Sequence, residues 1–206
     1  MLGWDTFDSR TVGGLLLAAA AVHAVLATRH WLRREPALAV YFSPRGGCAA
    51  AVVAAVAAAR SEVLVQAYSF SSPDIAAALA AAAKRRVRVV VLLDRSNEAE
   101  SYSELGDLQS HGVEVWIDAA HAIAHNKVIV IDGRTVLTGS FNFTRQAEYE
   151  NAENLLILRD HRDLAARYRA NFHGHRDHCR AAGAGGPAHA RTHEGQAQPA
   201  GPHGHR

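Results

Sequence analysis

The chain of 206 residues is long enough for one domain with a proper hydrophobic core and extensions at its ends. Its formal net charge of +2, with histidine neutral, is too small to indicate a nucleic-acid partner by itself. The two cysteines, Cys48 and Cys179, lack the spacing of a metal site, and one possible disulfide is weak evidence for an oxidising compartment.

The first distinctive segment is an apolar run from Val12 to Ala27, interrupted by His23. It is shorter than the roughly 20 residues of a comfortable membrane span, which leaves a cleaved signal peptide, a short retained anchor or a buried helix. The basic residues between 29 and 34 favour a retained anchor with the following domain on the cytoplasmic side. We therefore expect residues 1–39 to be a membrane-targeting segment with a linker, and the protein to be membrane-associated or exported, with the side of the membrane left open.

A folded domain is expected over residues 40–178, where short β-rich runs alternate with alanine-rich helical segments. One helix start is well marked, because Ser72 can cap it, Pro73 suits its first position and Asp74 complements the helix dipole. Strands are predicted at residues 62–70, 87–94, 113–118 and 153–158, and helices at residues 48–60, 72–86, 98–110 and 161–172.

Strands separated by helices at this spacing imply right-handed crossovers between neighbouring strands. We therefore predict an α/β fold with a mixed, mostly parallel sheet flanked by helices, to which a hairpin adds the antiparallel element. Residues 179–206 are rich in Gly, Ala, Pro and His without an apolar period, and they are expected to form a disordered tail. Metal binding by the scattered histidines of this tail is the alternative interpretation.

The hairpin is predicted around a two-residue Asp-Gly turn at residues 132–133, between two β-rich runs. The register that follows from this turn pairs Lys127 with Thr138 and His125 with Ser140. Directly opposed residues share a face of a sheet, so the polar side chains gather on one side. One face is expected to carry His125, Lys127, Thr138, Ser140 and Asn142, and the other face Val128, Val130 and Leu137.

These residues carry a resemblance to a known family. The pattern His125-x-Lys127-x4-Asp132, followed by Gly139-Ser140-x-Asn142, resembles the signature of the phospholipase D superfamily. The segments FSPRGG, AYSFSSPDI, GSFNFT and NAEN are similar to the small bacterial endonucleases of that superfamily, and mitochondrial cardiolipin hydrolases are more distant relatives. The resemblance covers about residues 41–172. The chain lacks the Cys/His insertion that the mitochondrial relatives carry after the first strand, which favours the bacterial type.

The resemblance implies a phosphodiesterase that works through a phosphohistidine intermediate. It makes His125 the nucleophile and gives Glu153 a hydrogen bond to the imidazole that fixes its tautomer. The phosphate ligands that it implies are Lys127, Ser140 and Asn142. This chemistry is physically reasonable, because attack by an imidazole divides one difficult displacement into two easier ones, while fixed donors stabilise the phosphate oxygens. For Asp132 and Gly139, which belong to the motif, a structural role is expected.

No metal or other cofactor is expected, because the folded part shows no cluster with metal-ligand spacing. His111 and His121 are interpreted as surface residues. A second imidazole must protonate the leaving oxygen, and the motif occurs once in the chain. The natural source is His125 of a second subunit, so we expect an obligate homodimer with an active site shared across the twofold interface.

Two substrate classes stay open at this point, nucleic acid and membrane phospholipid. A basic cluster could contact nucleic-acid phosphates, although the same residues suit a helix end and a solvated face. Its members are Lys84, Arg85, Arg86, Arg88 and Arg95. The N-terminal apolar segment supports a phospholipid instead. A nuclease with little sequence preference is placed ahead because the nearest resemblance lies there, and the intact motif argues against a catalytically silent binding protein.

Overall fold

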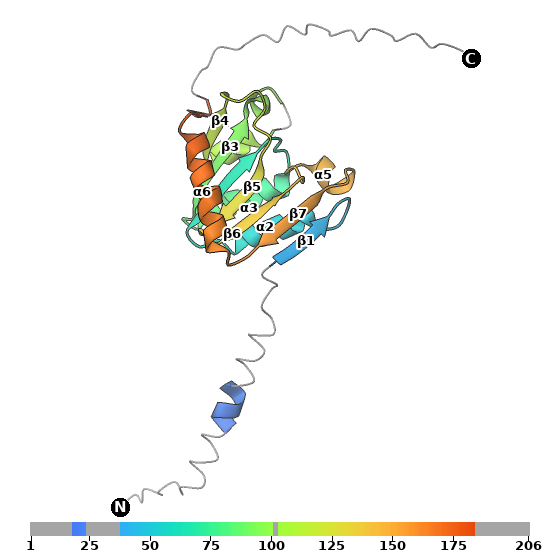
Figure 1. Ribbon diagram of the computed structural model, residues 1–206, viewed down its shortest axis with the longest axis vertical. Helices are drawn as coiled ribbons and strands as arrows, with labels where there is room; N and C mark the ends of the chain where they lie inside the picture. Colours follow the sequence, from blue (N-terminus) through green and yellow to red (C-terminus); the bar gives the residue numbers. More distant parts are fainter. Residues whose placement is uncertain (1–17, 24–37, 101–102, 184–206) are drawn as a thin grey trace, which may run out of the picture.

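The computed structural model describes residues 18–23, 38–100 and 103–183, and its centre is one eight-stranded sheet (Figure 1). The strands are β1 (Leu38–Phe42), β2 (Glu62–Ala67), β3 (Arg88–Asp94), β4 (Glu114–Asp118), β5 (Lys127–Ile131), β6 (Thr135–Gly139), β7 (Asn154–Leu158) and β8 (Arg180–Ala181). The helices are α2 (Cys48–Ala57), α3 (Pro73–Lys84), α4 (Leu105–Ser110), α5 (Arg145–Tyr149) and α6 (Arg162–Arg176), with a 3-10 helix, η1 (Arg95–Glu98).

The strand order is β1-β7-β6-β5-β2-β3-β4-β8, which confirms a mixed sheet flanked by helices. The sheet is nevertheless not mostly parallel. Only β2, β3 and β4 run parallel to one another, and every other neighbouring pair of strands is antiparallel. The reason lies in the connections: a helix returns the chain between β2 and β3 and again between β3 and β4, whereas β4 and β5 are joined by a short loop without a helix.

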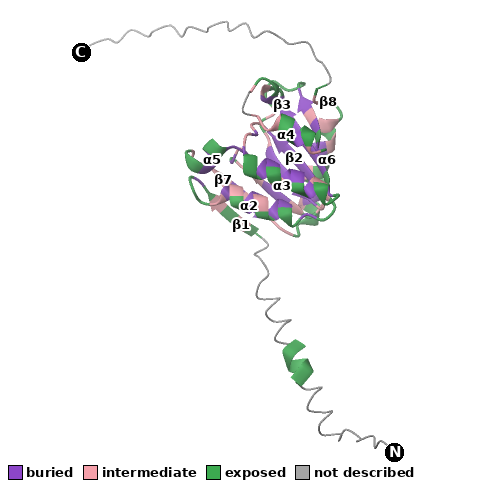
Figure 2. Ribbon diagram, turned by 180° about the vertical axis from the view of Figure 1, so that it is seen from behind, coloured by how far each residue is buried: buried purple, intermediate pink, exposed green. Residues whose placement is uncertain are grey.

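Helices cover both faces of the sheet, and each face has its own apolar core. α2 and α3 lie on the face seen in Figure 2, where they pack against side chains such as Val65, Val91 and Ile129. α6 lies on the opposite face, where Phe172 packs among residues such as Leu64. The start of α3 is as predicted: the Ser72 side chain accepts a hydrogen bond from the Ile75 backbone N–H, and proline occupies the first turn.

The β5–β6 hairpin forms as predicted, but its register is shifted by one residue. Val128 pairs with Thr138 and Ile129 pairs with Leu137, so the loop holds three residues, 132–134, and not two. Because a one-residue slip moves side chains to the other face, Thr138 shares a face with Val128, and Leu137 shares the face of Lys127. The expectation that Lys127 and Thr138 project together is therefore wrong.

Asp132 fixes this loop to the chain that enters β2. Its carboxylate accepts backbone N–H hydrogen bonds from Arg60, Ser61 and Glu62 at 2.8–3.2 Å, and a further one from the Ser61 hydroxyl at 2.8 Å. Burial alone would raise the pKa of this carboxyl, but the hydrogen bonds outweigh burial and lower its pKa. Asp132 also has a φ of 52°, in the left-handed region that Asp and Asn tolerate better than most residues.

The two ends of the chain fall mostly outside the described residues. The expected membrane-targeting segment, residues 1–39, is described only at residues 18–23, a short exposed helix, and from Leu38, where β1 begins. Among the described residues, no helix is long and apolar enough to cross a membrane. At the other end, β8 pairs with β4 inside the stretch expected to be a tail, and residues 184–206 lie outside the described part.

Replacing Asp132 should loosen the hairpin from β2. We expect Asp132→Ala to lower the free energy of unfolding by about 1–3 kcal/mol, because several backbone N–H groups lose a charged acceptor. The lowered pKa also means that this contribution is present above the ordinary Asp value of 3.8 and is lost as the pH falls below it. Urea unfolding at pH 7 and pH 3 measures both effects. Equal stability of Asp132→Ala and the unchanged chain at pH 7 would contradict this role.

Candidate active site

His125 lies directly before β5, at the end of the sheet where β2, β3 and β4 finish. Its side chain is exposed, and its ring packs beside the ring of Tyr68 with the centroids 4.7 Å apart. Tyr68 follows β2, and its backbone N–H donates to the Asn126 carbonyl at 2.9 Å. The pairing of β5 with β2 therefore continues to the residue next to His125, which holds an exposed imidazole on an ordered backbone.

Lys127, two residues further on, is a buried cation with only 7% of its surface exposed. Its Nζ donates to the His125 carbonyl oxygen at 3.0 Å and lies 5.0 Å from the centre of the Tyr68 ring. Burial lowers the pKa of Lys127, and the negative charge of Glu153 opposes that shift. Lys127 thus places a partly desolvated ammonium group beside the His125 backbone, where an anion would be attracted strongly.

Gly139 allows β6 to approach β7 closely just before Ser140. A Cβ atom at Gly139 would lie 2.2 Å from the Asn154 carbonyl oxygen, which then accepts backbone N–H hydrogen bonds from Ser140 and Phe141. The Ser140 hydroxyl donates to Asn154 Oδ1 at 3.0 Å and accepts from the Asn154 backbone N–H at 3.0 Å. Gly139 and Asn154 together fix the position of the exposed Ser140 side chain.

Asn142 and Glu153 differ in the hydrogen bonds that their side chains form. Asn142 Oδ1 is buried and has no hydrogen-bond partner within the described part of the chain. Glu153 Oε1 accepts from the Asn151 side chain at 3.2 Å, and its backbone N–H donates to the Ser43 hydroxyl at 3.1 Å. Over residues 38–100 and 103–183 no hydrogen bond joins Glu153 to His125, so the orienting role assigned to Glu153 stays a prediction.

The predicted basic cluster lies mainly at the other end of the sheet. Arg88 begins β3, pairs in register with Glu62 and forms an ion pair with that carboxylate at 2.9 Å. The Arg85 guanidinium donates to backbone carbonyls at the carboxyl end of α2, including that of Ala57 at 3.2 Å. Only Arg95 follows the carboxyl end of β3, where it donates to the Ala122 carbonyl oxygen. The cluster is therefore better described as the charges of a helix end and a solvated face than as a contact surface for nucleic-acid phosphates.

His121 is not a simple surface residue. Its Nδ1 lies 2.9 Å from Asp118 Oδ2, and its ring packs beside the ring of His175. Together with His178, these residues bring four potential metal ligands within 4.8 Å of one another, so the expectation of no such cluster in the folded part is wrong. Burial would raise the pKa of Asp118, but hydrogen bonds from His121 and His175 outweigh it and lower the pKa to about 2. His111 caps the end of α4 and contacts Asp107.

Three supporting residues were missed from the sequence. Tyr68 and Asn154 lie in the quoted segments AYSFSSPDI and NAEN, but nothing in their spacing shows that they contact His125 and Ser140. Glu148 is buried at 7% exposure, and its carboxylate accepts the backbone N–H groups of Gly47 and Ala49 at 3.0 and 2.8 Å. It therefore caps the start of α2 from more than 90 residues away, a contact that no local pattern reveals.

Residues 52–176 match the protein family described as "Cardiolipin synthase, PLD-like domain". The chain belongs to this phospholipase D-like family. It is 44% identical over 131 residues to the phospholipase D of Rickettsia felis, across 64% of this chain and 65% of that protein. It is 36% identical over 167 residues to the mitochondrial cardiolipin hydrolase of Xenopus laevis, across 70% of this chain and 79% of that protein. The chain thus spans just under two thirds of the length of the Rickettsia relative.

Two solved structures share the fold of this chain. Nuc from Salmonella typhimurium, a phospholipase D family member, superposes with a TM-score of 0.68 at 34% identity, covering 71% of this chain and 98% of Nuc. NucT from Helicobacter pylori superposes with a TM-score of 0.65 at 24% identity, which supports the fold alone. The described domain therefore aligns with nearly the whole length of the Nuc chain.

The close approach at Gly139 predicts that a single methyl group disrupts this phospholipase D-like site. Gly139→Ala should lower the free energy of unfolding by about 1–3 kcal/mol and displace Ser140, because β6 and β7 must separate to relieve the overlap with Asn154.

Gly106→Ala is the matched control, since a Cβ at this position of α4 meets nothing within 4 Å. This control should be neutral or stabilising by up to about 1 kcal/mol. Urea unfolding and phosphodiesterase assays compare the two variants, and a harmless Gly139→Ala would contradict the packing argument.

Proposed function

We propose that this protein is a phosphodiesterase that works through a phosphohistidine intermediate. The activity that we propose first is that of a non-specific endonuclease on DNA or RNA. The proposal depends on one observation: the exposed imidazole of His125 lies next to the buried ammonium of Lys127. Both lie at the end of the sheet where β2, β3 and β4 finish. An accessible nucleophile and a fixed positive charge are the two requirements for displacement at an anionic phosphodiester.

The reaction would proceed in two displacements. In the first, an imidazole nitrogen of His125 attacks phosphorus, the phosphorus–oxygen ester bond breaks, and an acid gives its proton to the leaving oxygen. In the second, water attacks the phosphohistidine, loses a proton to the conjugate base of that acid, and releases the imidazole. Dividing the reaction in this way replaces one difficult step by two easier ones.

The phosphate would be held by groups that the fold leaves available. The ammonium of Lys127 has three donors, and in the described part of the chain one of them is used, by the His125 carbonyl. The Asn142 amide oxygen is buried without a partner among the described residues, and the NH2 group of the same amide would donate to a phosphate oxygen. Ser140, exposed just after β6, would complete the set once its hydroxyl, which donates to Asn154 Oδ1 in this structure, turns to the phosphate. Glu153 would act on His125 only after a rearrangement of the free site, since their hydrogen bond is not formed here.

The acid in this scheme would be His125 of a second subunit. His121, the nearest histidine in sequence, packs against Asp118 and His175 and does not contact His125. The ring that does contact His125 belongs to Tyr68. A twofold axis through the site would bring a second imidazole to the opposite side of the phosphorus, which makes a homodimer the proposed active form.

Nucleic acid is the first substrate proposal because the motif segments resemble the small bacterial endonucleases of the superfamily. The match to 98% of the Nuc chain at 34% identity supports the same choice. The basic cluster at residues 84–88 gives no additional support, since it lies at the far end of the sheet, where Arg85 donates to backbone carbonyls and Arg88 pairs with carboxylates. Any contact with nucleic-acid phosphates would depend on residues near His125 and on the exposed Arg45 and Arg145 in the segments around α5.

Membrane phospholipid is the second candidate, and a specific surface feature favours it. The outer face of β1 exposes three apolar side chains in alternation, Leu38, Val40 and Phe42, each more than half exposed. Curated relatives of the chain bear the names phospholipase D and mitochondrial cardiolipin hydrolase. An apolar strand face at the end of the expected membrane-targeting segment would suit a membrane-associated or exported enzyme, on a side of the membrane that stays open.

Removal of the proposed nucleophile tests the function directly. His125→Ala and His125→Asn should abolish cleavage of both a DNA substrate and cardiolipin vesicles, whichever of the two the unchanged protein cleaves, while the circular dichroism spectrum stays the same. Cleavage of DNA alone would support the nuclease, and cleavage of vesicles alone would support the lipid hydrolase. A variant that keeps more than about a hundredth of the activity would refute the assignment, because acid–base catalysis alone contributes about 10²–10⁴-fold.

The shared site can be tested by mixing subunits. Increasing amounts of inactive His125→Ala chains, co-refolded with unchanged chains, should reduce activity as the square of the unchanged fraction, because a mixed dimer holds one imidazole. Mixed dimers of His125→Ala and Asn142→Ala chains should stay inactive for the same reason. A linear loss of activity, or full activity in a species that sedimentation shows to be monomeric, would contradict the dimer proposal.

A further inference from the structure

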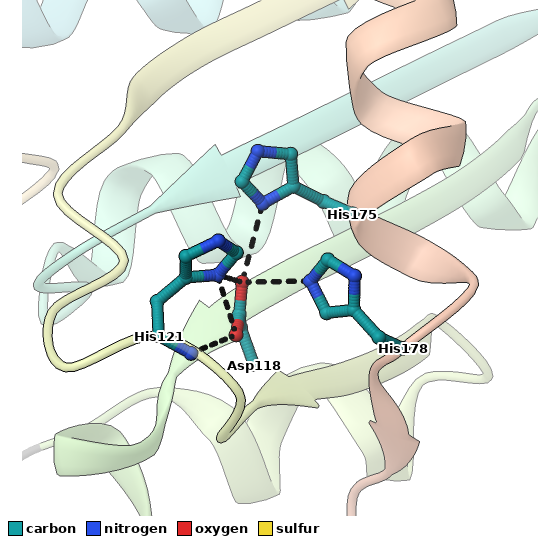
Figure 3. Close-up of side chains that lie close together, drawn as sticks. All are labelled: Asp118, His121, His175 and His178. Carbon is teal, nitrogen blue, oxygen red and sulfur yellow. Dashed lines mark hydrogen bonds and ion pairs between the residues drawn. The ribbon is translucent and has the colours of Figure 1, made fainter.

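Four side chains with metal-binding atoms converge where β4 ends and α6 finishes. They form the β4–α6 cluster, whose members are Asp118, His121, His175 and His178. Figure 3 shows that the three imidazole rings point toward the carboxylate from different segments: the loop after β4, the last turn of α6 and the turn that follows α6. The sequence brings them together through two pairs with the same spacing, D-x-x-H at the end of β4 and H-x-x-H at the end of α6.

The distances within this cluster are close to those of a four-coordinate site. Asp118 Oδ2 lies 2.9 Å from His121 Nδ1, 3.2 Å from His175 Nδ1 and 3.6 Å from His178 Nε2. All four donor atoms lie within 4.8 Å of one another. Zinc bonds of about 2.0–2.1 Å in a tetrahedron separate the donor atoms by about 3.3–3.4 Å, so only small side-chain movements are needed.

Hydrogen bonding alone does not account for this convergence. Asp118 Oδ1 already accepts the backbone N–H groups of Ala120 and His121, at 3.1 and 3.2 Å. Oδ2 then faces three imidazole nitrogens, although a carboxylate oxygen offers only about two lone-pair positions. The three rings also crowd one another, with centroids 4.9–5.4 Å apart, although they come from separate segments of the chain.

The geometry points to a binding site for a divalent transition metal in the β4–α6 cluster, with three imidazole nitrogens and one carboxylate oxygen as ligands. This donor set is one that Zn²⁺ prefers, and the ligand count matches a closed structural site. One ion would replace the crowded hydrogen bonds on the carboxylate and would require no proton on any of the three coordinating nitrogens.

A second observation at the same place points to a bound group. Gln66 is 3% exposed, and its Oε1 has no hydrogen-bond partner among the described residues. Gln66 lines a small cavity together with Asp118 and His175. Ligating histidines usually donate their second ring N–H to a nearby oxygen, and Gln66 Oε1 is an acceptor in the cavity that His175 lines.

The position of the cluster indicates a structural role for the ion. Asp118 follows Trp116 by two residues in β4 and so lies on the face of the sheet that α6 covers. Lys127 shares the opposite face with Ile129, so the ion would not contact the phosphate. It would instead join β4, the end of α6 and the loop at residues 119–126. His121 is in this loop, four residues before His125. The loop is also held by the Ala124 N–H, which donates to Asp94, and by Arg95, which donates to the Ala122 carbonyl oxygen. The ion would therefore stabilise the loop that carries the proposed nucleophile.

Metal content and thermal stability of the tag-free full chain test the inference. We expect one equivalent of Zn²⁺ to remain after dialysis, and the melting temperature to fall by roughly 5–10 °C when EDTA removes the ion from a site held near a hundred times its Kd. Co²⁺ added to the stripped protein should give the intense visible absorption of a tetrahedral complex. His178→Ala and Asp118→Asn should lose the equivalent, the spectrum and the stabilisation.

Matched controls separate this site from other histidines. His173→Ala, on the same helix but outside the cluster, should bind metal normally, and so should His125→Ala. Substituting the four histidines at 189, 193, 203 and 205 should likewise leave the bound equivalent in place. The inference is overturned if the protein holds no stoichiometric metal, or if His178→Ala and Asp118→Asn, both folded by circular dichroism, bind as much metal as the unchanged chain. It is equally overturned if the metal is lost with the tail histidines.

Discussion

The antiparallel pairing of β5 with β2 is the contact on which the arrangement of this domain depends. β2 has β3 on one side and β5 on the other, so it joins the parallel part of the sheet to the antiparallel part. Because β5 runs against β2, Lys127 at its start pairs with Ala67 at the end of β2. The residues before β5 consequently reach the carboxyl ends of three parallel strands, the edge where α/β sheets usually place functional side chains.

The two ends of β5 carry opposite charges, which differ in how fully hydrogen bonds compensate them. Asp132, after the strand, is surrounded by backbone N–H donors that satisfy its negative charge. Lys127, at the start, is buried, and among the described residues one hydrogen bond, one aromatic face and the negative charge of Glu153 offset the loss of water only in part. The first charge serves the fold. The second is held at an energetic cost that an incoming anion would relieve, as is common where a protein binds a charged ligand.

Sequence patterns predicted most of this structure where the signal is local. The cap at Ser72, the alternation of strands and helices, and the motif around His125 each depend on neighbours in the chain. The patterns failed where distant segments decide the outcome. Asp132 is drawn into hydrogen bonds with residues 60–62, which favours a longer loop and shifts the register of the hairpin. His121 packs beside His175 and His178, which come from the far end of α6. Nothing in the sequence near His121 therefore distinguishes it from a surface residue.

Strand β8 has a consequence for where the folded domain ends. Arg180 and Ala181 pair with Ile117 and Trp116 of β4, and without them β4 would become an edge strand with unpaired backbone groups. The boundary suggested by composition, at residue 178, would cut the chain just before this short strand. A shortened chain ending there would leave the backbone groups of Trp116 and Ile117 open to pairing with other chains, and we expect it to aggregate more readily than the full chain.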